Sequence, residues 1–367
     1  MSTEFSGFLA IPGAIEGTGA DAGVAAHYGN PALEQRALAA GTAIVDLSHR
    51  AVLSLTGPDR LSWLNSISSQ SLTGLQPGES TETLILDQNG RLEHALRLVD
   101  DGVALWILVE RAEVDGLLVW LNRMKFMMRV ELADRSDEYK TIGSLGSPEV
   151  PVAAPNGVPL IWRDPWPAVS TGGWQYARGE HPAAAFTYSE LIINRDDHAA
   201  ATALPVAGML ALEALRIAAW RPRLATEVDD KSIPHELDWL RTAVHLSKGC
   251  YRGQETVAKV HNLGHPPRRL VMLHLDGSDA VLPSHGDPVE SGDKLVGQIT
   301  SAARHHELGP IALAVVKRNT DPAAVLAVLS DGIRIAAAQE IIVPTDAGAA
   351  ANVPRLPRLG AVKRPSL

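Results

Sequence analysis

The chain has 367 residues, a formal net charge of -9 and 46% hydrophobic residues, which is enough apolar material for a sizeable core. A single core stops growing at about 250–300 residues, so the length predicts two or three domains. The acidic balance disfavours direct nucleic-acid binding, which needs a basic face. The one cysteine, Cys250, cannot form an intramolecular disulfide, and neither a basic leader nor a long apolar run is visible. We therefore expect a cytoplasmic protein without membrane contact.

The first part of the chain predicts strands and helices in mixed order. Asn89-Gly90 lies between two apolar segments and is typical of a tight β-hairpin, because it supplies a positive φ. Gly57-Pro58 separates an alternating apolar segment from one with helical spacing. This order indicates an α+β fold rather than a doubly wound parallel sheet. The expected strands are 51–56, 81–86, 91–99 and 103–109, and the expected helices are 31–40, 59–67 and 113–124.

Regular periodicity fades between residues 144 and 181, where we expect loops that keep three tryptophans packed. A helix follows at 209–219, with Leu210, Ala214 and Ile217 predicted on its inward face. From residue 269 onward, short apolar segments alternate with Gly-containing turns, which predicts a small antiparallel barrel. The three tryptophans are Trp162, Trp166 and Trp174, and the expected barrel strands are 270–275, 294–300, 311–316, 325–329 and 333–337.

The densest chemistry lies in the segment from Lys248 to Glu255. Its two glycines allow a sharp turn and a close approach to a ligand. Cys250 stands just before an expected helix and near Lys248 and Arg252, which would favour its thiolate. The alternative is an inert cysteine that acts as a small hydrophobic residue. The histidines match no zinc-site spacing, so we expect no metal site. No phosphate-binding glycine loop is present either.

These eight residues resemble the K-G-C-[FY]-x-G-Q-E signature of the YgfZ family of folate-binding proteins. The flanking segments resemble that family in the same order. Other segments resemble the related T-protein, the aminomethyltransferase of the glycine cleavage system. The resemblance therefore covers about residues 40 to 345. The flanking segments are 212–217, 233–236, 257–259 and 268–271, and those resembling the T-protein are 46–49, 297–301 and 309–314.

The resemblance implies an aminomethyltransferase-like, three-part ring of two intertwined α+β subdomains and a C-terminal antiparallel β-barrel, with tetrahydrofolate in a central hole. It divides the chain into a leader with a short helix, a folate-binding region of two subdomains, the barrel and a disordered tail. We expect these parts at residues 1–38, 39–267, 268–345 and 346–367.

By resemblance, the protein would bind tetrahydrofolate and support the assembly or repair of iron-sulfur clusters, affecting tRNA-modifying iron-sulfur enzymes indirectly. Its partners would be folate and iron-sulfur client or assembly proteins. The alternatives are a tetrahydrofolate-dependent aminomethyltransferase or demethylase, and a scaffold without useful folate affinity. Two departures bear on this choice. Residues 110–115 lack the Asn-Asp turn of the T-proteins, and Ala218 and Trp220 stand where the family has a pterin-binding Glu and a Gly.

Cys250 is the candidate reactive thiol, and Asp115 is a weaker candidate for a catalytic carboxylate, because an Asp opposite the apolar face of a helix is most often solvated. Arg268 and Arg269 could clamp the glutamate tail of a folate or could form a solvated strand end. Glu227 or Asp229 could replace the missing pterin carboxylate. Tyr251 could stack on the pterin or belong to the core, and Gln254 and Glu255 could bind ligand or cap the helix. The candidate cofactor-binding residues are Lys248, Gly249, Tyr251, Gly253, Gln254, Glu255, Arg268 and Arg269.

Overall fold

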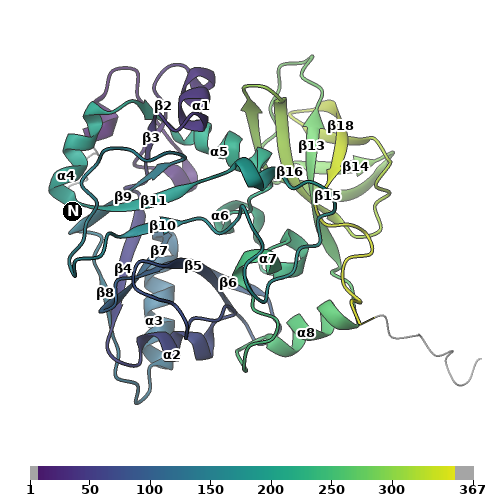
Figure 1. Ribbon diagram of the computed structural model, residues 1–367. Coiled ribbons are helices and arrows are strands. Elements are labelled where there is room, and N and C mark those ends of the chain that lie inside the picture. The colour runs from purple at the N-terminus through teal and green to yellow at the C-terminus, as the bar shows by residue number, and fades with distance from the viewer. Residues whose placement is uncertain (1–6, 352–367) are drawn as a thin grey trace, which may run out of the picture.

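The computed structural model describes residues 7–351, which form two five-stranded sheets and a closed six-stranded barrel (Figure 1). The strand order is β10-β11-β9-β3-β12 in the first sheet and β5-β6-β7-β4-β8 in the second. The chain starts the first sheet, builds the whole second sheet and then returns to complete the first, so the two α+β units are intertwined. The expected α+β ring with a C-terminal antiparallel barrel is confirmed.

The strands of each sheet come from segments far apart in sequence. The first sheet contains β3 (Ile44–Asp46), β9 (Tyr139–Ser144), β10 (Ile161–Arg163), β11 (Ser189–Asn194) and β12 (Val206–Ala207). The second contains β4 (Arg50–Thr56), β5 (Ser80–Leu86), β6 (Leu92–Asp100), β7 (Ala104–Glu110) and β8 (Glu131–Asp134). The barrel contains β13 (Arg268–Leu275), β14 (Pro288–Ser291), β15 (Lys294–His305), β16 (Gly309–Lys317), β17 (Leu326–Ser330) and β18 (Ile333–Ile341). A two-stranded ribbon, β1 (Ile15–Glu16) with β2 (Ala25–His27), precedes them.

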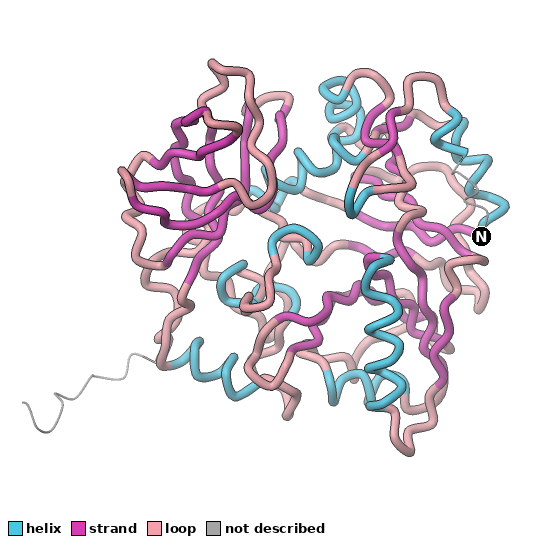
Figure 2. The backbone as a smooth tube through the Cα atoms, turned by 180° about the vertical axis from the view of Figure 1, so that it is seen from behind, coloured by secondary structure: helices cyan, strands magenta, loops and turns pink. Residues whose placement is uncertain are grey.

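Helices cover the second sheet and fill the space beside the barrel (Figures 1 and 2). The amphipathic helix α3 and the shorter α2 bury their apolar side chains with those of the second sheet in one core. Another core joins the barrel to α5, α7 and α8, so the barrel is tightly packed on the rest. The helices are α1 (Pro31–Ala39), α2 (Arg60–Ile67), α3 (Val114–Met124), α4 (Arg195–Ala200), α5 (Met209–Ala218), α6 (Leu224–Glu227), α7 (Leu240–Ala243) and α8 (Gln254–Asn262).

Most expected elements form within a residue or two of their predicted bounds. The hairpin of β5 and β6 pairs antiparallel around Gly90, which has φ +77 as its turn requires. Strand β14 was not predicted, because it is four residues long and begins with Pro288, which disfavours strands by composition. Only its two neighbours, β15 and β17, hold it in the barrel.

Two packing expectations were wrong. Leu210 is 45% exposed, although we expected it on the inward face of α5. Helix α5 packs against α1 on one side and against the barrel on another, so most of its side chains are buried. Leu210 lies on the part of the helix surface that neither neighbour covers. Trp174 is 44% exposed, because it lies in a loop at the surface, where its ring makes an edge-to-face contact with His261 with the ring centroids 5.0 Å apart.

Residues 346–351, which we expected in a disordered tail, contact the rest of the molecule. Ala350 N donates to His261 O, Ala347 is buried and Asp346 forms an ion pair with Arg178. The rest of the expected tail lies outside the described residues, as does the start of the leader.

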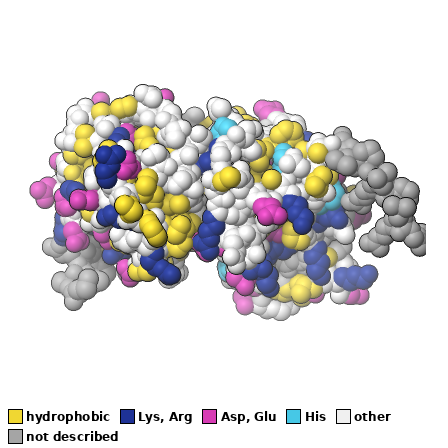
Figure 3. Space-filling model, turned by 90° about the horizontal axis from the view of Figure 1, so that it is seen from below, with side chains coloured by type: hydrophobic (Ala, Val, Ile, Leu, Met, Phe, Trp, Pro, Cys, Tyr) yellow, Lys and Arg dark blue, Asp and Glu magenta, His cyan; other side chains and the backbone are white. Residues whose placement is uncertain are grey.

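Seen from below, basic, acidic and apolar side chains are interspersed rather than gathered in one basic surface (Figure 3). Within residues 7–351, the helices are all too short or too polar to span a bilayer.

Candidate functional site

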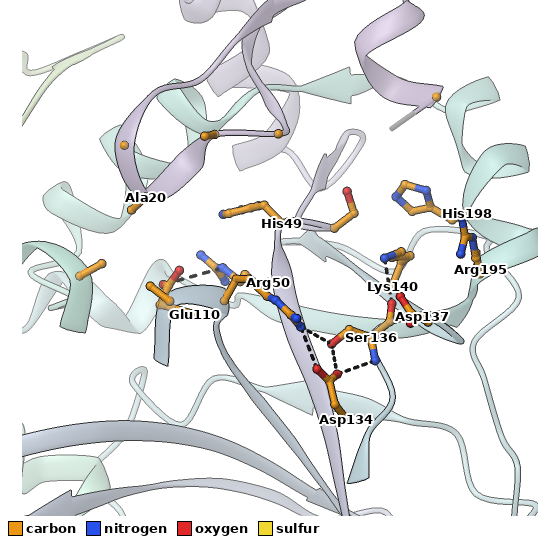
Figure 4. A pocket seen from close by; sticks show the side chains of 18 of the residues that line it. Ala20, His49, Arg50, Glu110, Asp134, Ser136, Asp137, Lys140, Arg195 and His198 are labelled. Atoms are coloured by element: carbon orange, nitrogen blue, oxygen red, sulfur yellow. Dashed lines mark hydrogen bonds and ion pairs between the residues drawn. The ribbon is translucent and has the colours of Figure 1, made fainter. Parts of the chain in front are cut away.

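A cavity of about 920 Å³ lies where the chain passes between the two sheets (Figure 4). Only residues 47–49 separate β3 from β4, and residues 135–138 separate β8 from β9. Each connection crosses from one sheet to the other, so polar side chains from both crossings meet at the cavity. The start of the chain, the segment after β7 and helix α4 complete its walls.

Lys140, Arg195 and His198 lie together on one side of this cavity, and Asp137 lies beside Lys140 in the same wall (Figure 4). Lys140 Nζ donates a 2.8 Å hydrogen bond to Ser136 O, and Arg111 Nη1 lies 2.9 Å from Asp134 Oδ2. Burial lowers the pKa of Lys140, and the positive charges of Arg195 and Arg111 lower it further. An anion in this wall would be attracted by Lys140 and Arg195 and repelled by Asp137.

His198 is fixed by a carboxylate that also shapes the first crossing. Its Nε2 lies 2.9 Å from Asp46 Oδ1, and Asp46 accepts hydrogen bonds from both N and Oγ of Ser48. Asp46 thereby orients one ring of the cavity wall and the turn that leads into β4.

The opposite side of the cavity holds His49, Arg50 and Glu110 (Figure 4). His49 Nε2 lies 3.5 Å from Asp21 Oδ1. Burial alone would raise the pKa of Asp21, but His49 and Arg223 lower it to about 2. Glu110 is buried as well, and Arg50 and Arg223 hold its pKa well below the usual range despite that burial.

Behind Arg50 and Glu110, buried ion pairs fill the meeting point of the two sheets, α5 and the barrel. We call this group the ionic junction. Arg221 binds Glu82 with both terminal nitrogens and Asp164 with Nε, at 2.7–3.1 Å. The cavities left between these side chains are only about 30 and 10 Å³. The ionic junction consists of Arg50, Glu82, Arg97, Glu110, Asp164, Glu190, Glu213, Arg216, Arg221, Arg223 and Glu227.

The Lys248–Glu255 segment lies elsewhere, packed on the second sheet's hairpin turn and on the end of α2. Lys248 Nζ donates to the carbonyl oxygens of Asn65, Ser68 and Gln70, at 2.6–2.8 Å. These bonds use the three hydrogens of an ammonium group, so Lys248 fixes backbone rather than ligand. Burial lowers its pKa to about 8.

Cys250 is exposed on this fixed loop, two residues after Lys248. Gly253 begins α8 with φ +82, and a Cβ at that position would lie 2.6 Å from Asp87 O. The thiol is thus presented to solvent by a loop whose two ends are held in place. None of the segment's residues lines the 920 Å³ cavity.

Three comparisons with known proteins agree on the fold. Residues 268–342 match the family model described as the glycine cleavage T-protein C-terminal barrel domain. An aminomethyltransferase of Symbiobacterium thermophilum is 25% identical over 318 residues, which cover 79% of this chain and 82% of that protein. The tRNA-modifying protein YgfZ of Colwellia psychrerythraea is 24% identical over 242 residues, covering 64% of this chain and 72% of that protein. The crystal structure of the glycine cleavage system aminomethyltransferase T from Bartonella henselae matches with a TM-score of 0.71 at 16% identity, covering 92% of this chain and 95% of that chain.

The fold is that of an aminomethyltransferase. Within this aminomethyltransferase fold, Trp220 ends α5 with φ +58, a conformation that glycine adopts at lower cost. The resemblance placed a glycine there, and the backbone keeps that shape although the indole ring is buried. Ala218, at the place of the expected Glu, packs against the core that joins the barrel to the rest.

The other candidates are spread over the aminomethyltransferase fold. Arg268 is bound to Asp229 and Glu236, and the buried Arg269 donates to Thr320 O and to Gln339 Oε1. Asp115 is exposed on α3. Glu227 receives hydrogen bonds from Arg216 and Arg223 N, so neither it nor Asp229 is available as a pterin acceptor without losing a partner. Tyr251 is buried in the core, and Gln254 Nε2 donates to Lys248 O. Glu255 is exposed in the first turn of α8, and Gly249 is exposed in the loop that precedes this helix.

The cavity residues were not predicted from the sequence. Arg50, Lys140, Arg195 and His198 belong to no short motif, and the cavity brings together residues from segments far apart in the chain, such as His198 and Asp46. The one available signal was the segment 46–49, which resembles the T-protein and supplies Ser48 and His49 to the wall. Within residues 7–351, no three His, Cys, Asp or Glu side chains are grouped so as to hold a metal ion.

Proposed function

We propose that this protein is a cytoplasmic tetrahydrofolate-binding accessory protein that supports iron-sulfur cluster assembly or repair. The observation that carries the folate part is the 920 Å³ cavity with a cationic wall. Its volume lies within the roughly 300–1,000 Å³ range of small-molecule sites. The aminomethyltransferase fold and the relatives named aminomethyltransferase and YgfZ support the same ligand.

A reduced folate has two chemically different ends, and the cavity has two different sides. The glutamate carboxylates of the ligand suit the side with Lys140 and Arg195, because cations bind carboxylates through charge-assisted hydrogen bonds. The amide and amino donors of the pterin suit the side with His49, whose Nδ1 has no hydrogen-bond partner among the described residues. The buried ion pairs of the ionic junction leave no comparable space there, so we assign the folate to this cavity, whose walls come from the proposed folate-binding region 39–267 and from residues 7–23.

The accessory part of the proposal rests on the position of Cys250. A thiol that is exposed and outside the cavity walls cannot attack a ligand held in that cavity. Its surface position suits exchange with a sulfur species or an iron-sulfur protein, and cytoplasmic reductants would keep it a thiol. Iron-sulfur client or assembly proteins are therefore the proposed partners, and an effect on tRNA-modifying enzymes would be indirect.

Aminomethyl transfer to tetrahydrofolate is the second candidate function, because several relatives carry the name aminomethyltransferase. Such a transfer needs a carboxylate beside the folate nitrogen. Asp115 is exposed on α3 and outside the cavity walls, Glu110 is held by Arg50 and Arg223, and Asp134 is held by Arg111. Asp137 is a further carboxylate in the walls, so the choice of the accessory role rests on the position of Cys250.

Anaerobic calorimetry with tetrahydrofolate tests the proposal. We expect micromolar binding by the wild type and at least a tenfold loss in Ala112→Phe, which places a ring in the cavity. Ala323→Phe, an equally exposed alanine outside the cavity, is the matched control and should bind like the wild type. No heat of binding at millimolar folate would refute the folate assignment.

A carrier assay separates the two candidate functions. The protein is incubated with tetrahydrofolate and an aminomethyl-loaded lipoyl protein, and methylenetetrahydrofolate and ammonia are measured. Product formation would overturn the accessory role. The purified Cys250→Ala variant should bind folate normally. In cells that lack the gene it should fail to restore iron-sulfur enzyme activity, and full restoration would show that Cys250 is an inert residue.

A further inference from the structure

We propose that the turn between α3 and β8 attaches the protein reversibly to the surface of an anionic lipid bilayer. Its two central residues, Phe126 and Met127, would insert among the lipid headgroups. This contact needs no membrane-spanning helix, and it depends neither on the folate cavity nor on Cys250. It differs from our sequence-based expectation of no membrane contact, which considered only leaders and long apolar runs.

The first observation is the exposure of the turn. Phe126 and Met127 are 93% and 90% exposed, which is more than any other large apolar side chain of the described residues. Met124, at the end of α3, is also exposed, so three apolar side chains lie within four positions. Figure 3 views this end of the molecule and shows apolar side chains beside basic ones there. Single exposed apolar residues are common, but a group that is almost fully exposed marks a contact surface.

The second observation is that the backbone of this turn does not suit the residue it contains. Met128 N donates a 2.9 Å hydrogen bond to Lys125 O, which closes a tight turn around Phe126 and Met127. Phe126 has φ +47, a conformation that glycine and asparagine adopt at lower cost than an aromatic residue. Because its ring is almost fully exposed, packing within the chain does not offset this strain. A contact outside the chain would give a phenylalanine at this position a use.

The third observation is that the base of the turn is fixed. Arg129 N and Nε each donate a 2.9 Å hydrogen bond to Asp59 Oδ2, and Arg129 Nη2 donates to Oδ1 at 2.7 Å. Trp63 Nε1 donates to Met124 O at 3.1 Å. The backbone at Gly57 lies so close that a Cβ there would collide with Arg129 O. The two ends of the turn are therefore tied to α2 and to the end of β4, and the apolar pair is presented in one place.

The charged groups beside the turn leave a small positive excess. Arg123 and Lys125 form no ion pair among the described residues, whereas Arg129 is bound to Asp59. Glu131, at the start of β8, is an exposed carboxylate beyond the turn. Cations are common in the last turn of a helix, where they complement its dipole, so the apolar pair carries the inference and the cations set the preference for an anionic surface. The other charged groups at this end of the sheet already have partners: Arg60 with Asp100, Asp101 with Val103 N and Ala104 N, and Glu79 with Gln76 N.

The shape of the turn favours a bilayer over a protein. The turn projects where α3 leads into β8, and none of residues 123–129 lines one of the cavities described above (Figure 1). A projecting apolar tip can enter a fluid bilayer at any point, whereas a protein partner must offer a pocket of matching shape. A second copy of this chain would bring Arg123 and Lys125 against the same cations, and like charges disfavour such a contact.

Co-sedimentation with lipid vesicles tests the proposal. One set of vesicles is pure phosphatidylcholine, and the other contains about one third phosphatidylglycerol. For the wild type we expect at least about fivefold tighter binding to the anionic vesicles, with the difference shrinking as salt is raised. Lys125→Gln should reduce this preference about threefold, whereas Lys294→Gln, at an exposed lysine of the barrel, should leave it unchanged.

The double variant Phe126→Asn/Met127→Ser removes the apolar tip and should weaken binding to both kinds of vesicle at least about tenfold. Because asparagine tolerates the positive φ, this variant should melt at no lower temperature than the wild type. Leu295→Ser/Val325→Ser is the matched control, because it removes two exposed apolar side chains of the barrel and should leave vesicle binding unchanged.

The absence of vesicle binding by the wild type, or equal binding by the wild type and the tip variant, would overturn the proposal. If light scattering shows a wild-type dimer that the tip variant dissociates, the turn docks on a second copy. If the tip variant fails to restore iron-sulfur enzyme activity in cells although the wild type binds no vesicles, the turn docks on another protein. Either result would overturn the membrane assignment and leave the folate assignment untouched.

Discussion

Asp238 is a buried carboxyl group with an unusual balance of partners. Burial raises its pKa to about 7, and hydrogen bonds from Tyr176 N and the charge of Arg241 offset the cost of burial only in part. Its second oxygen, Oδ2, has no hydrogen-bond partner among the described residues. Its backbone has φ +54, which asparagine and aspartate tolerate better than most residues.

We predict that Asp238→Asn stabilises the protein at high pH and has little effect at low pH. Near pH 3.8 and below, both the folded and the unfolded chains bind the proton. As pH rises from 3.8 to about 7, the unfolded chain releases its proton first, so the free energy of unfolding of the wild type falls. Above about pH 7 the destabilisation of the wild type by the buried carboxylate no longer changes with pH. At about 1.4 kcal/mol per pKa unit, the gain at pH 8 is roughly 2–4 kcal/mol.

Urea unfolding at pH 5 and pH 8 measures this effect. Asp230→Asn is the control, because Asp230 lies on the surface and should give the same stability as the wild type at both values. A stability gain in Asp238→Asn that is equal at both pH values would show that titration of the carboxyl group is not the cause.

Residue identity alone predicted chemistry only where neighbours in sequence are also neighbours in space. The exposed thiol at Cys250 and the glycines around it were visible in one short segment. Lys248 was predicted beside that thiol, but its three acceptors lie about 180 positions earlier in the chain, so its role in holding backbone was not visible. Lys140 has a local acceptor in Ser136, but the charge of Arg195, which also acts on it, lies 55 positions away in the chain, so its place in the cavity was not visible either.

At the scale of elements, the start of α8 and the turn of the β5–β6 hairpin approach each other unusually closely. A Cβ on Gly253 would lie 2.6 Å from Asp87 O and 2.9 Å from Gly90 Cα. A Cβ on Gly90 would in turn meet Thr256 at 2.9 Å. The sequence predicted both the hairpin and the helix, but it could not show that two glycines let them touch.

We predict that Gly253→Ala destabilises the protein by about 1–3 kcal/mol, because it adds both a steric clash and a strained positive φ. Gly249→Ala is the matched control in the same motif, because a Cβ there meets nothing within 4 Å. Thermal melting of the two variants is the measurement. Equal melting temperatures would mean that the hairpin and α8 can separate at little cost.

The Gly253→Ala variant also links this contact to the thiol. Because Gly253 fixes one end of the loop that carries Cys250, the variant should change the rate at which iodoacetamide alkylates Cys250, while Gly249→Ala should alkylate more nearly like the wild type. The same rate in both variants would show that the loop is held by Lys248 alone.

At the scale of the whole molecule, the ring architecture could be predicted from family-like segments that follow one another in the expected order along the chain. The ionic junction could not be predicted. Short turns and alternating apolar residues indicated the barrel, and the resemblance supplied the arrangement of the remaining parts. The junction combines Arg and Glu residues from both sheets, α5 and the segment after it, and each of these residues looks like an ordinary surface charge in sequence. Only the closed ring brings them together, so the central space that the resemblance implied is occupied by side chains.

Arg223 is the residue that connects most parts of this junction. Its guanidinium contacts Glu110 of the second sheet, Glu213 of α5 and Asp21 near the start of the chain, at 2.9–3.4 Å. We predict that Arg223→Met lowers the free energy of unfolding by about 3–5 kcal/mol, because it leaves buried carboxylates without their partner. Arg334→Met removes a surface ion pair with Glu290, in which the arginine is 48% exposed, and should cost far less.

The double variant Arg223→Met/Glu110→Gln separates the loss of attraction from the cost of an unpaired charge. If the unpaired carboxylate is the main cost, the double variant should be more stable than Arg223→Met, because Glu110 no longer has to remain charged in a buried place. Urea unfolding of the wild type, the single variants Arg223→Met and Glu110→Gln, and the double variant gives the coupling energy. A loss in Arg223→Met no greater than that in Arg334→Met would mean that solvent reaches the ionic junction, and the centre of the ring would then be open enough to hold a ligand.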